Sequence, residues 1–493
     1  MAHQVGKPGF LARVYMSGSL RGARRIFIVL LAAVLSPAAQ ALDFADCVKA
    51  ALQQNPAMLE AHAESAEAKG AVSAARGHLL PKLTASFSAS QSNNALTVFG
   101  MKLSQRRATF NSFGANQFDP NLGAAGLDIA PGNLDHPSGY HNFGTKLQLD
   151  IPIWNGGAIR GGIDQATAML RAAQNGDRAA QQKLIFALLQ AYDGVVAAQS
   201  AIEVAEKAQQ AAAAYVKTSR QLLARGVIVK SDLLSAEVHQ EEAQLALRHA
   251  RDQKANALEN LAVLIGRAQT EGLEVGAPVM PAFPEGTLEQ LQAEALADNA
   301  GIQALREQLK AARARAGVTV ARAAYLPHVN AMANQEWNGT GIGNGAPSYT
   351  VGGEVSWAAL DFSRGGQVDS ARAKVQLQLA KLQQAEDHLR VQLGQAWRAA
   401  HEASARVKSR ELAVRQAEEA QRLLRLRYEN GVETLTGLLR GQAELDRIRA
   451  ELVQARYDEA VERAALWLAL GKLELAHIVA VTGASVPQEG ATG

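Results

Sequence analysis

The sequence predicts a mostly α-helical protein that also carries a membrane β-barrel, with long coiled-coil helices, four β-strands per chain and two internal repeats. Three observations support this class. No proline lies between Pro152 and Pro278 or between Pro347 and Pro487, so helices can run uninterrupted there. Four shorter segments alternate apolar and polar residues, which is typical of strands with one apolar face. Landmarks of the first half recur in the second.

Composition limits the possible function classes. The chain has 493 residues, of which 48% are hydrophobic but only 5% aromatic, a balance that favours closely packed helices over a broad core. The formal charge of +3 depends on five bases in residues 1–41, and the remainder carries 45 bases against 47 acids. Bulk charge therefore gives no reason to expect a nucleic-acid partner.

The N-terminus has the pattern of a secretory signal peptide over residues 1–41. Two arginines precede an apolar run at 26–35, and Ala39-Gln40-Ala41 fits a cleavage site before Leu42. The alternative, an internal transmembrane helix, is disfavoured because this run is too short to cross a bilayer. Cys47 is the only cysteine, which excludes an intrachain disulfide, and we interpret it as a buried thiol and not as a lipid anchor.

Internal similarity divides the mature chain into a first repeat at 42–266, a connector at 267–286 and a second repeat at 287–471. Paired landmarks support this division: Ala51 to Asn55 with Ala295 to Asn299, Leu80-Pro81 with Leu326-Pro327, Gly156-Gly157 with Gly365-Gly366, and Leu264-Ile265-Gly266 with Ala469-Leu470-Gly471. The connector carries three prolines and is expected to be ordered but irregular. Residues 472–493 are expected to form a mobile C-terminal tail.

Each repeat is predicted to run helix, strand, loop, strand, very long helix, turn and return helix. The first repeat has a helix at 57–79, strands at 82–92 and 143–151, a long helix at 157–225 and a return helix at 232–266. The second has an initial helix, strands at 328–337 and 349–357, a long helix at 366–429 and a return helix at 435–471. The long helices would reach about 100 Å, and their 3.5-residue apolar period predicts a partner helix alongside.

The predicted strands have two unlike faces. In 82–92, leucine, alanine and phenylalanine alternate with serine and threonine. In 143–151, aliphatic residues alternate with Lys146, Gln148 and Asp150, and Glu354 holds a similar polar position in the last strand. We expect the four polar residues to face a water-filled lumen and the apolar residues to face lipid.

Four strands are too few to close a bacterial membrane barrel, since even the smallest use eight. Three copies would supply twelve, and closure would remove every open edge. We therefore predict a homotrimer with a 12-stranded barrel. Trp154, Trp357 and Phe362 lie at strand ends, where aromatic residues either mark the membrane interface or pack at a strand-to-helix corner. The long loop 93–141 is expected at the cell surface or folded into the mouth.

No motif for catalysis or cofactor binding is present, so the sequence predicts neither an enzyme nor a bound cofactor. Asp135, His136 and His141 lie close together in the loop 93–141. Two histidines five positions apart are weak grounds for a metal site, and a solvated loop accounts for them. No metal site is predicted.

The doubled pattern of Leu-Pro before each strand pair, Gly-Gly after it and a glycine at each helical tip resembles the outer-membrane factor family of TolC-like exit ducts, over residues 43–471. The resemblance implies a homotrimer in the outer membrane of a Gram-negative bacterium, with a helical tunnel extending into the periplasm. It implies a periplasmic adaptor (membrane fusion) protein and an inner-membrane transporter of the RND, ABC or MFS class as partners. Substrates would be drugs, metals or secreted polypeptides. The alternative, a periplasmic coiled-coil scaffold without a pore, has no use for amphipathic strands.

The resemblance also implies roles for the tips, where the family opens, closes and meets its adaptor. The adaptor-contacting residues would be Arg225, Gly226, Val227, Asn430, Gly431 and Val432. Asp232 and Tyr428 match positions that tie neighbouring helices shut, whereas Glu433 replaces an expected base, and Gly437 and Arg440 replace expected acids. Because Asp232 and Glu433 would repel each other, the tie is lost or passes to Arg440 or Lys230. Alternatively, Arg440 is a solvated helix residue.

Overall fold

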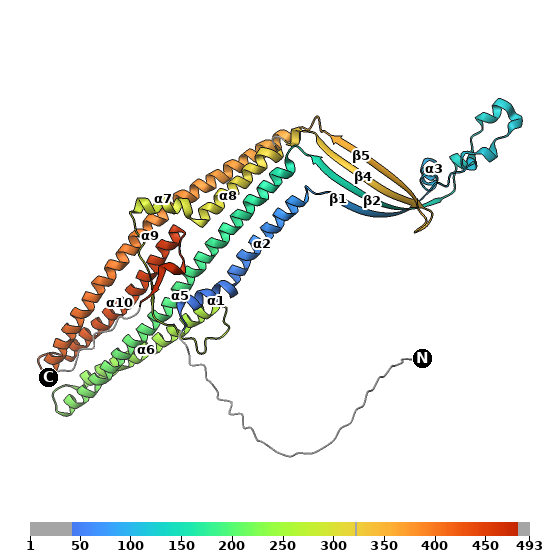
Figure 1. The fold of residues 1–493 in the computed structure, drawn as a ribbon. Helices are drawn as coiled ribbons and strands as arrows, with labels where there is room; N and C mark the ends of the chain where they lie inside the picture. Colours follow the sequence, from blue (N-terminus) through green and yellow to red (C-terminus); the bar gives the residue numbers. More distant parts are fainter. Residues whose placement is uncertain (1–41, 321–322, 482–493) are drawn as a thin grey trace, which may run out of the picture. The chain divides into compact units, whose positions relative to one another are not determined.

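The computed structural model describes residues 42–320 and 323–481. The predicted signal peptide at 1–41 and the end of the predicted tail at 482–493 lie outside the described residues. As expected from the sequence, the fold is mostly helical with long helices and one four-stranded antiparallel sheet (Figure 1).

The elements of the two repeats follow each other in the same order. The first contains α1 (Phe44–Gln54), α2 (Pro56–Gly77), β1 (Lys82–Ser92), α3 (Ala95–Ser104), α4 (Gly132–Asp135), β2 (Tyr140–Trp154), α5 (Ala158–Ala224) and α6 (Lys230–Leu264). The connector holds β3 (Val279–Pro281). The second contains α7 (Leu288–Asp298), α8 (Ala300–Ala314), β4 (His328–Gly339), β5 (Ala346–Ser356), α9 (Ser363–Glu429) and α10 (Leu435–Leu470), and β6 (Ile478–Ala480) follows.

The helices α5 and α9 each contain 67 residues and organise the packing. The return helix α6 packs along α5, α10 packs along α9, and α8 packs on both α5 and α9. Leu188, Tyr192 and Val195 of α5 are fully buried at helical spacing, and Leu382, Leu389 and Leu393 of α9 are buried in the same way, with at most 9% of each exposed. By length and composition α5 could also cross a membrane, but these buried side chains place its apolar seam against other helices.

A duplicated asparagine joins the short helices of each repeat to its return helix. The Asn55 side chain caps α2 through the Ala57 N–H and donates to the Leu264 carbonyl at the end of α6, 3.0 Å away. Asn299 likewise caps α8 and donates to the Ala469 carbonyl of α10 at 3.2 Å. The helix predicted at 57–79 corresponds to α2, and α1 is a separate helix before it that was not predicted. Pro56 fits the first turn of α2 and separates the two helices.

The sheet has the strand order β1-β2-β4-β5, with all three pairs antiparallel. The two strand pairs of the repeats therefore meet in the middle through β2 and β4. β1 and β5 each have a neighbour on one side only, so the sheet has two open edges. β1 has the predicted bounds, whereas β2 and β5 begin earlier than predicted, at Tyr140 and Ala346, and β4 ends later, at Gly339.

Two predicted irregular segments contain structure. The loop 93–141 includes α3, α4 and several short 3-10 turns, although a single irregular loop was expected. The prediction of a mobile tail from residue 472 is wrong as far as residue 481, because Ile478–Ala480 pair with Val279–Pro281 of the connector. The Trp467 indole stacks on His477 at 3.9 Å between ring centroids and donates to the Ala282 carbonyl at 2.7 Å. These contacts hold the C-terminal strand on the helices.

Candidate functional site

The strand register places all four predicted lumen residues on one face of the sheet. Lys146 lies opposite Ser86 and Glu336, Gln148 lies opposite Thr84 and Asn334, and Asp150 lies opposite Lys82 and Met332. Glu354 lies opposite Asn330, which has the same parity along β4. Directly opposed residues share a face. We call this surface the polar face, and within it Lys146 has Glu336 as its cross-strand neighbour and Lys82 has Asp150.

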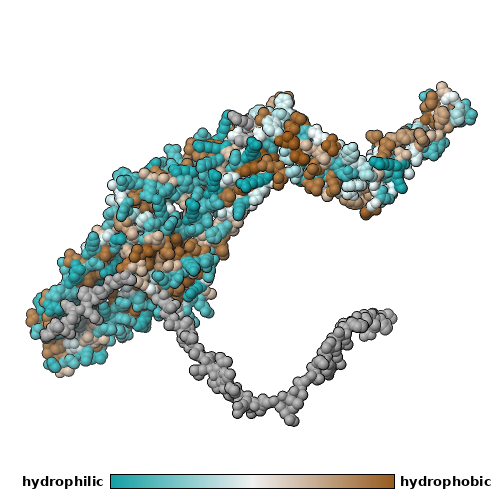
Figure 2. Space-filling view, in the orientation of Figure 1, coloured by the Kyte–Doolittle hydropathy of each residue, from teal (hydrophilic) through white to brown (hydrophobic). Residues whose placement is uncertain are grey.

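The other face of the sheet is apolar and uncovered. Its exposed side chains include Leu83 (67%), Phe87 (57%), Val351 (73%) and Val355 (69%). Phe87 also packs against Phe143 of the neighbouring strand, with 6.4 Å between ring centroids. Figure 2 shows apolar surface over the end of the sheet that adjoins the helices, while the helices present a mostly hydrophilic surface. Such an exposed apolar surface is the mark of a face that meets lipid or another protein.

The three predicted interfacial aromatics lie where the sheet meets the long helices. Trp154 is the last residue of β2 and pairs with Val329 beyond an irregularity in the register. The Trp357 indole donates to the Tyr325 carbonyl at 3.3 Å, and Phe362 is 95% exposed at the start of α9. Trp154 and Trp357 also expose much of their surface, 43% and 61%.

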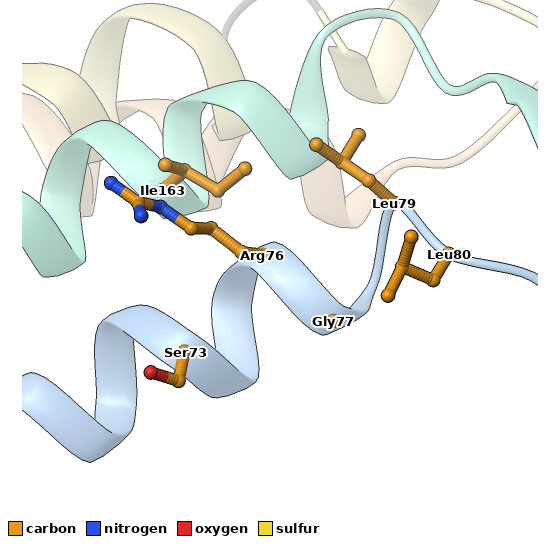
Figure 3. Close-up of a pocket in the computed structure, with 6 residues that line it drawn as sticks. All are labelled: Ser73, Arg76, Gly77, Leu79, Leu80 and Ile163. Atoms are coloured by element: carbon orange, nitrogen blue, oxygen red, sulfur yellow. The ribbon is translucent and has the colours of Figure 1, made fainter.

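Two open concavities flank the junction of α2 with the sheet. One of about 640 Å³ borders the polar face and includes Gln148, Asp150 and Glu354. The other, of about 590 Å³, lies between the end of α2 and α5 and is lined by Ser73, Arg76, Gly77, Leu79, Leu80 and Ile163 (Figure 3). The second contains no acid or histidine that could transfer protons.

Both helical tips use the same hydrogen-bonded turn. The Gly226 N–H donates to the Leu223 carbonyl and the Val227 N–H to the Leu222 carbonyl, each at 2.9 Å. Gly431 and Val432 repeat this arrangement with Tyr428 and Arg427. The glycines have φ of +74° and +72°, a left-handed conformation that other residues adopt at a cost. The flanking Val227 and Val432 are exposed, as a contact site for another protein requires.

The predicted gate residues around these tips are not tied to one another within the chain. A carboxylate oxygen of Asp232 accepts from the Val229 N–H at 3.4 Å at the start of α6. Glu433 pairs with Arg427 of its own hairpin at 3.7 Å. In the described part of the chain, Arg440 and Lys230 form no ion pair. Gly437 leaves room for the Glu433 carboxylate, which a Cβ would approach to 2.3 Å.

Tyr428, the fifth gate residue, is buried between the two hairpins. It packs in a cluster with Tyr215 and Val216 of α5, Ala236 of α6 and Leu438 of α10. Its hydroxyl has no hydrogen-bond partner among the described residues. Tyr428 therefore contributes chiefly by packing in this state of the chain.

A buried hydrogen-bond network above the tips was missed at the sequence level. The Tyr215 hydroxyl donates to Gln442 Oε1 at 3.0 Å, and Gln421 Nε2 donates to both at 2.8 and 3.0 Å. Gln442 in turn donates to Asp446 Oδ1 at 2.9 Å. Burial raises the pKa of the Tyr215 hydroxyl, so it stays a donor at neutral pH. The network ties the α5 hairpin to α9 and α10. Its members are far apart in sequence, and no local signal marks them.

A buried carboxyl on α5 was also missed. Asp193 is 4% exposed, and its Oδ1 accepts from the Val279 N–H of β3 at 3.0 Å. Burial raises the pKa of this carboxyl to about 7, although the Val279 hydrogen bond acts to lower it. The neighbouring Tyr192 hydroxyl accepts from the Gly276 N–H at 3.0 Å. Together the two side chains fasten the connector to α5.

No group of three or more histidine, cysteine, aspartate and glutamate side chains comes together in residues 42–320 and 323–481. Asp135, His136 and His141 thus do not form such a group. The geometry offers two segregated sheet faces, long helices and exposed tips.

Comparison with known proteins agrees with this geometry. The model of the outer membrane efflux protein family matches residues 47–267 and 291–472. The alkaline protease secretion protein AprF of Pseudomonas aeruginosa is 25% identical over 373 residues, which cover 73% of this chain and 76% of AprF. The structure of VceC from Vibrio cholerae shares the fold with a TM-score of 0.70 and 20% identity, over 87% of this chain and 97% of VceC. The CmeC outer membrane channel of Campylobacter jejuni aligns with a TM-score of 0.71 and 16% identity, over 87% of this chain and 86% of CmeC.

The matched ranges cover most of the chain and fall into two parts, as the internal repeat does. Membership of this family also accounts for the lack of catalytic motifs, because its members act as channels. The chain therefore belongs to the outer membrane efflux protein family, whose members are non-enzymatic channels of the outer membrane that extend into the periplasm and work with partners in tripartite systems.

Proposed function

We propose that three copies of the chain join their sheets into one 12-stranded barrel and form the passive exit duct of a tripartite export system. One observation carries this proposal: the sheet has an open edge at β1 and another at β5, and the face opposite the polar face carries exposed apolar side chains. Backbone groups in lipid must all be paired within protein, which a sheet achieves only by closing. Two further copies would supply a neighbour for both edges.

Closure would direct the two faces to different solvents. The polar face, with Lys146, Gln148, Asp150 and Glu354, would line a water-filled lumen, and the apolar face would contact outer-membrane lipid. Trp154, Trp357 and Phe362 would then lie in the interfacial belt, where aromatic rings are favoured. This assignment is supported by the register, which keeps the charged residues of all four strands on one side.

The helices would continue the duct into the periplasm. At 67 residues, α5 and α9 each extend about 100 Å. We assign the periplasmic aperture to Asp232, Tyr428, Glu433, Gly437 and Arg440, which surround the tips. The exposed turns at 225–227 and 430–432 would bind the periplasmic adaptor protein. An inner-membrane transporter of the RND, ABC or MFS class would supply the energy, because the duct itself has no catalytic site.

The substrate follows from the partner pump. The curated relative AprF is a protease secretion protein, which favours secreted polypeptides as one class of cargo. Drugs and metals would pass by the same route when the pump supplies them. The deletion strain separates these classes: sensitivity to drugs, sensitivity to metals and loss of a secreted protein are distinct phenotypes.

The barrel is tested by one pair of substitutions at the middle of β5. Val351→Lys places a charge on the apolar face, where a lysine at mid-membrane costs about 2–4 kcal/mol. Thr350→Lys places the same charge on the polar face of the adjacent position. We expect Val351→Lys to abolish assembly, whereas Thr350→Lys yields trimers that conduct. Light scattering of detergent-extracted protein and planar-bilayer recording measure the two properties.

The outcomes separate the duct from the scaffold alternative. A wild-type monomer that forms pores would contradict the pooled barrel. A trimer that never conducts, with equal tolerance of both lysines, would instead support a pore-free scaffold.

A further inference from the structure

In the long segment between β1 and β2, the helix α3 and the Gln105 that follows it pack on the polar face of the sheet. Gln105, which follows α3, is 5% exposed, and its amide donates to the His141 carbonyl and to Asn142 Oδ1, both at 2.9 Å, and to the Gly339 carbonyl at 3.3 Å. Lys102 lies over the Tyr140 ring, 5.6 Å from its centroid. Tyr140 and Asn142 have the same parity along β2 as Lys146, so α3 contacts the side of the sheet that carries the lumen residues.

A chain of amides continues this contact along the polar face. Asn142 donates to Asn338 Oδ1 at 2.7 Å, and Asn338 donates to Glu336 Oε1 at 2.8 Å. Asn338 is itself only 4% exposed. Gln105 therefore joins a buried polar network that crosses from β2 to β4, and removing it would leave buried polar groups unpaired.

Two arginines that follow Gln105 bind β5 and the turn between β4 and β5. Arg106 donates to the Pro347 carbonyl and Arg107 donates to Thr340 Oγ1, both at 2.9 Å. Arg106 has φ of +55°, the one left-handed residue other than glycine in the described ranges. That conformation costs about 1–2 kcal/mol, so the contacts on either side hold it in place. Hydrogen bonds to the β1–β2 pair and to the β4–β5 pair thus hold α3 over the polar face.

The free side of α3 is apolar and uncharged. Val98, Met101, Lys102 and Gln105 lie on the side that packs, at helical spacing. On the opposite side, Leu96 is 81% exposed and Leu103 is 50% exposed, one heptad apart, with the exposed Gly100 between them. The side of a helix that faces water normally carries polar residues, so two exposed leucines at this spacing mark an exposed apolar side of α3.

We propose that α3 forms an uncharged constriction on the lumen side of the barrel's outer mouth. This inference rests on the proposed barrel, because the polar face becomes the lumen wall only on closure. Three copies would then direct Leu96 and Leu103 towards one axis, where the leucine side of each α3 faces the α3 helices of the other two copies. Apolar constrictions resist hydrated ions by dewetting, so this ring would restrict small ions at the exit.

Single cysteines test the position of α3. The only native thiol, Cys47, is buried, and burial raises its pKa to about 11, so the wild-type channel is an unreactive blank. Leu103→Cys probes the free side of α3, Ser86→Cys probes the polar face of β1, and Leu83→Cys probes the adjacent apolar position. Each trimer is recorded in a planar bilayer before and after addition of a negatively charged, membrane-impermeant methanethiosulfonate.

We expect modification to change the conductance of the Leu103→Cys and Ser86→Cys channels stepwise and to leave the Leu83→Cys channel unchanged. If Ser86→Cys responds and Leu103→Cys does not, the barrel stands and the constriction is refuted. If Ser86→Cys is also silent, the barrel itself fails. As a second measurement, Leu103→Asp should raise the small-ion conductance by wetting the ring, and an unchanged conductance would overturn the proposal. Leu103 is exposed, so neither substitution disturbs the core.

Discussion

Asp193 shows how one buried carboxyl makes the folded chain sensitive to pH. Its pKa is raised from the ordinary 3.8 to about 7 by burial, so the folded state holds the proton more tightly than the unfolded state. Because ionising the buried group is unfavourable, the free energy of unfolding falls as the pH rises. This loss is absent below about pH 4 and complete above about pH 7. Tyr192 and Tyr457 lie near it and stay neutral over this range, since burial also raises their pKa.

Asp193→Asn is expected to remove this pH dependence while keeping an oxygen for the Val279 N–H. A shift of this size corresponds to about 4 kcal/mol at most between pH 4 and pH 8. In thermal denaturation of detergent-solubilised protein, the denaturation temperature of the variant should rise relative to that of the wild type as the pH rises. Equal denaturation temperatures across the whole range would mean that Asp193 is hydrated.

Replacing either tip glycine by alanine is expected to destabilise the folded chain. Gly226→Ala and Gly431→Ala each force an L-residue to a φ above +70° and should cost about 1–2 kcal/mol in the free energy of unfolding. Gly70→Ala is the matched control, because Gly70 lies within α2 with open space around it and alanine favours a helix by about 0.5–1 kcal/mol. Denaturant titrations should therefore show a lower free energy of unfolding for the tip variants and a higher one for Gly70→Ala. A stabilising Gly226→Ala would contradict the turn geometry.

The element that couples the two coiled hairpins is the network of Tyr215, Gln421 and Gln442. Tyr215→Phe removes a hydroxyl that makes two buried hydrogen bonds and should cost about 1–3 kcal/mol. Tyr428→Phe removes a hydroxyl without a partner in the described chain and should be close to neutral. Hydrogen exchange of the amides near both tips should rise only in the first variant. Equal exchange in the two would show that packing alone holds the hairpins together.

Local periodicity was sufficient to predict the strands and long helices, and long-range contacts account for what it missed. The alternation of Leu83 to Ala89 with serines is a property of neighbouring residues, so the faces of the sheet were predictable. The helix α3 depends on Gln105 reaching strands β2 and β4, and β6 depends on a connector some 200 residues earlier in the chain. No window of the sequence contains both partners of such contacts, and Asp193 in an alanine-rich seam resembles any solvated acid.

At the scale of the whole channel, the charge of the aperture should decide ion selectivity. Arg440 is exposed and forms no ion pair among the described residues, so three copies would add unbalanced positive charge near the tips. We expect weak cation preference in the wild type and stronger cation preference in Arg440→Asp, measured as reversal potentials under a salt gradient. Arg372→Asp makes the same charge change near the other end of α9 and should have little effect. Strong cation preference in the wild type would contradict the assignment of Arg440 to the aperture.

The unpaired edges of β1 and β5 have a genetic consequence. Each subunit would complete its sheet with strands from two others, so one defective copy would impair the function of the whole trimer that contains it. A cell making intact and defective chains in equal amounts would build only about one eighth of its ducts from intact chains alone, by random mixing in a three-membered ring. An allele such as Leu103→Asp, which still assembles, would thus behave as dominant over its normal counterpart.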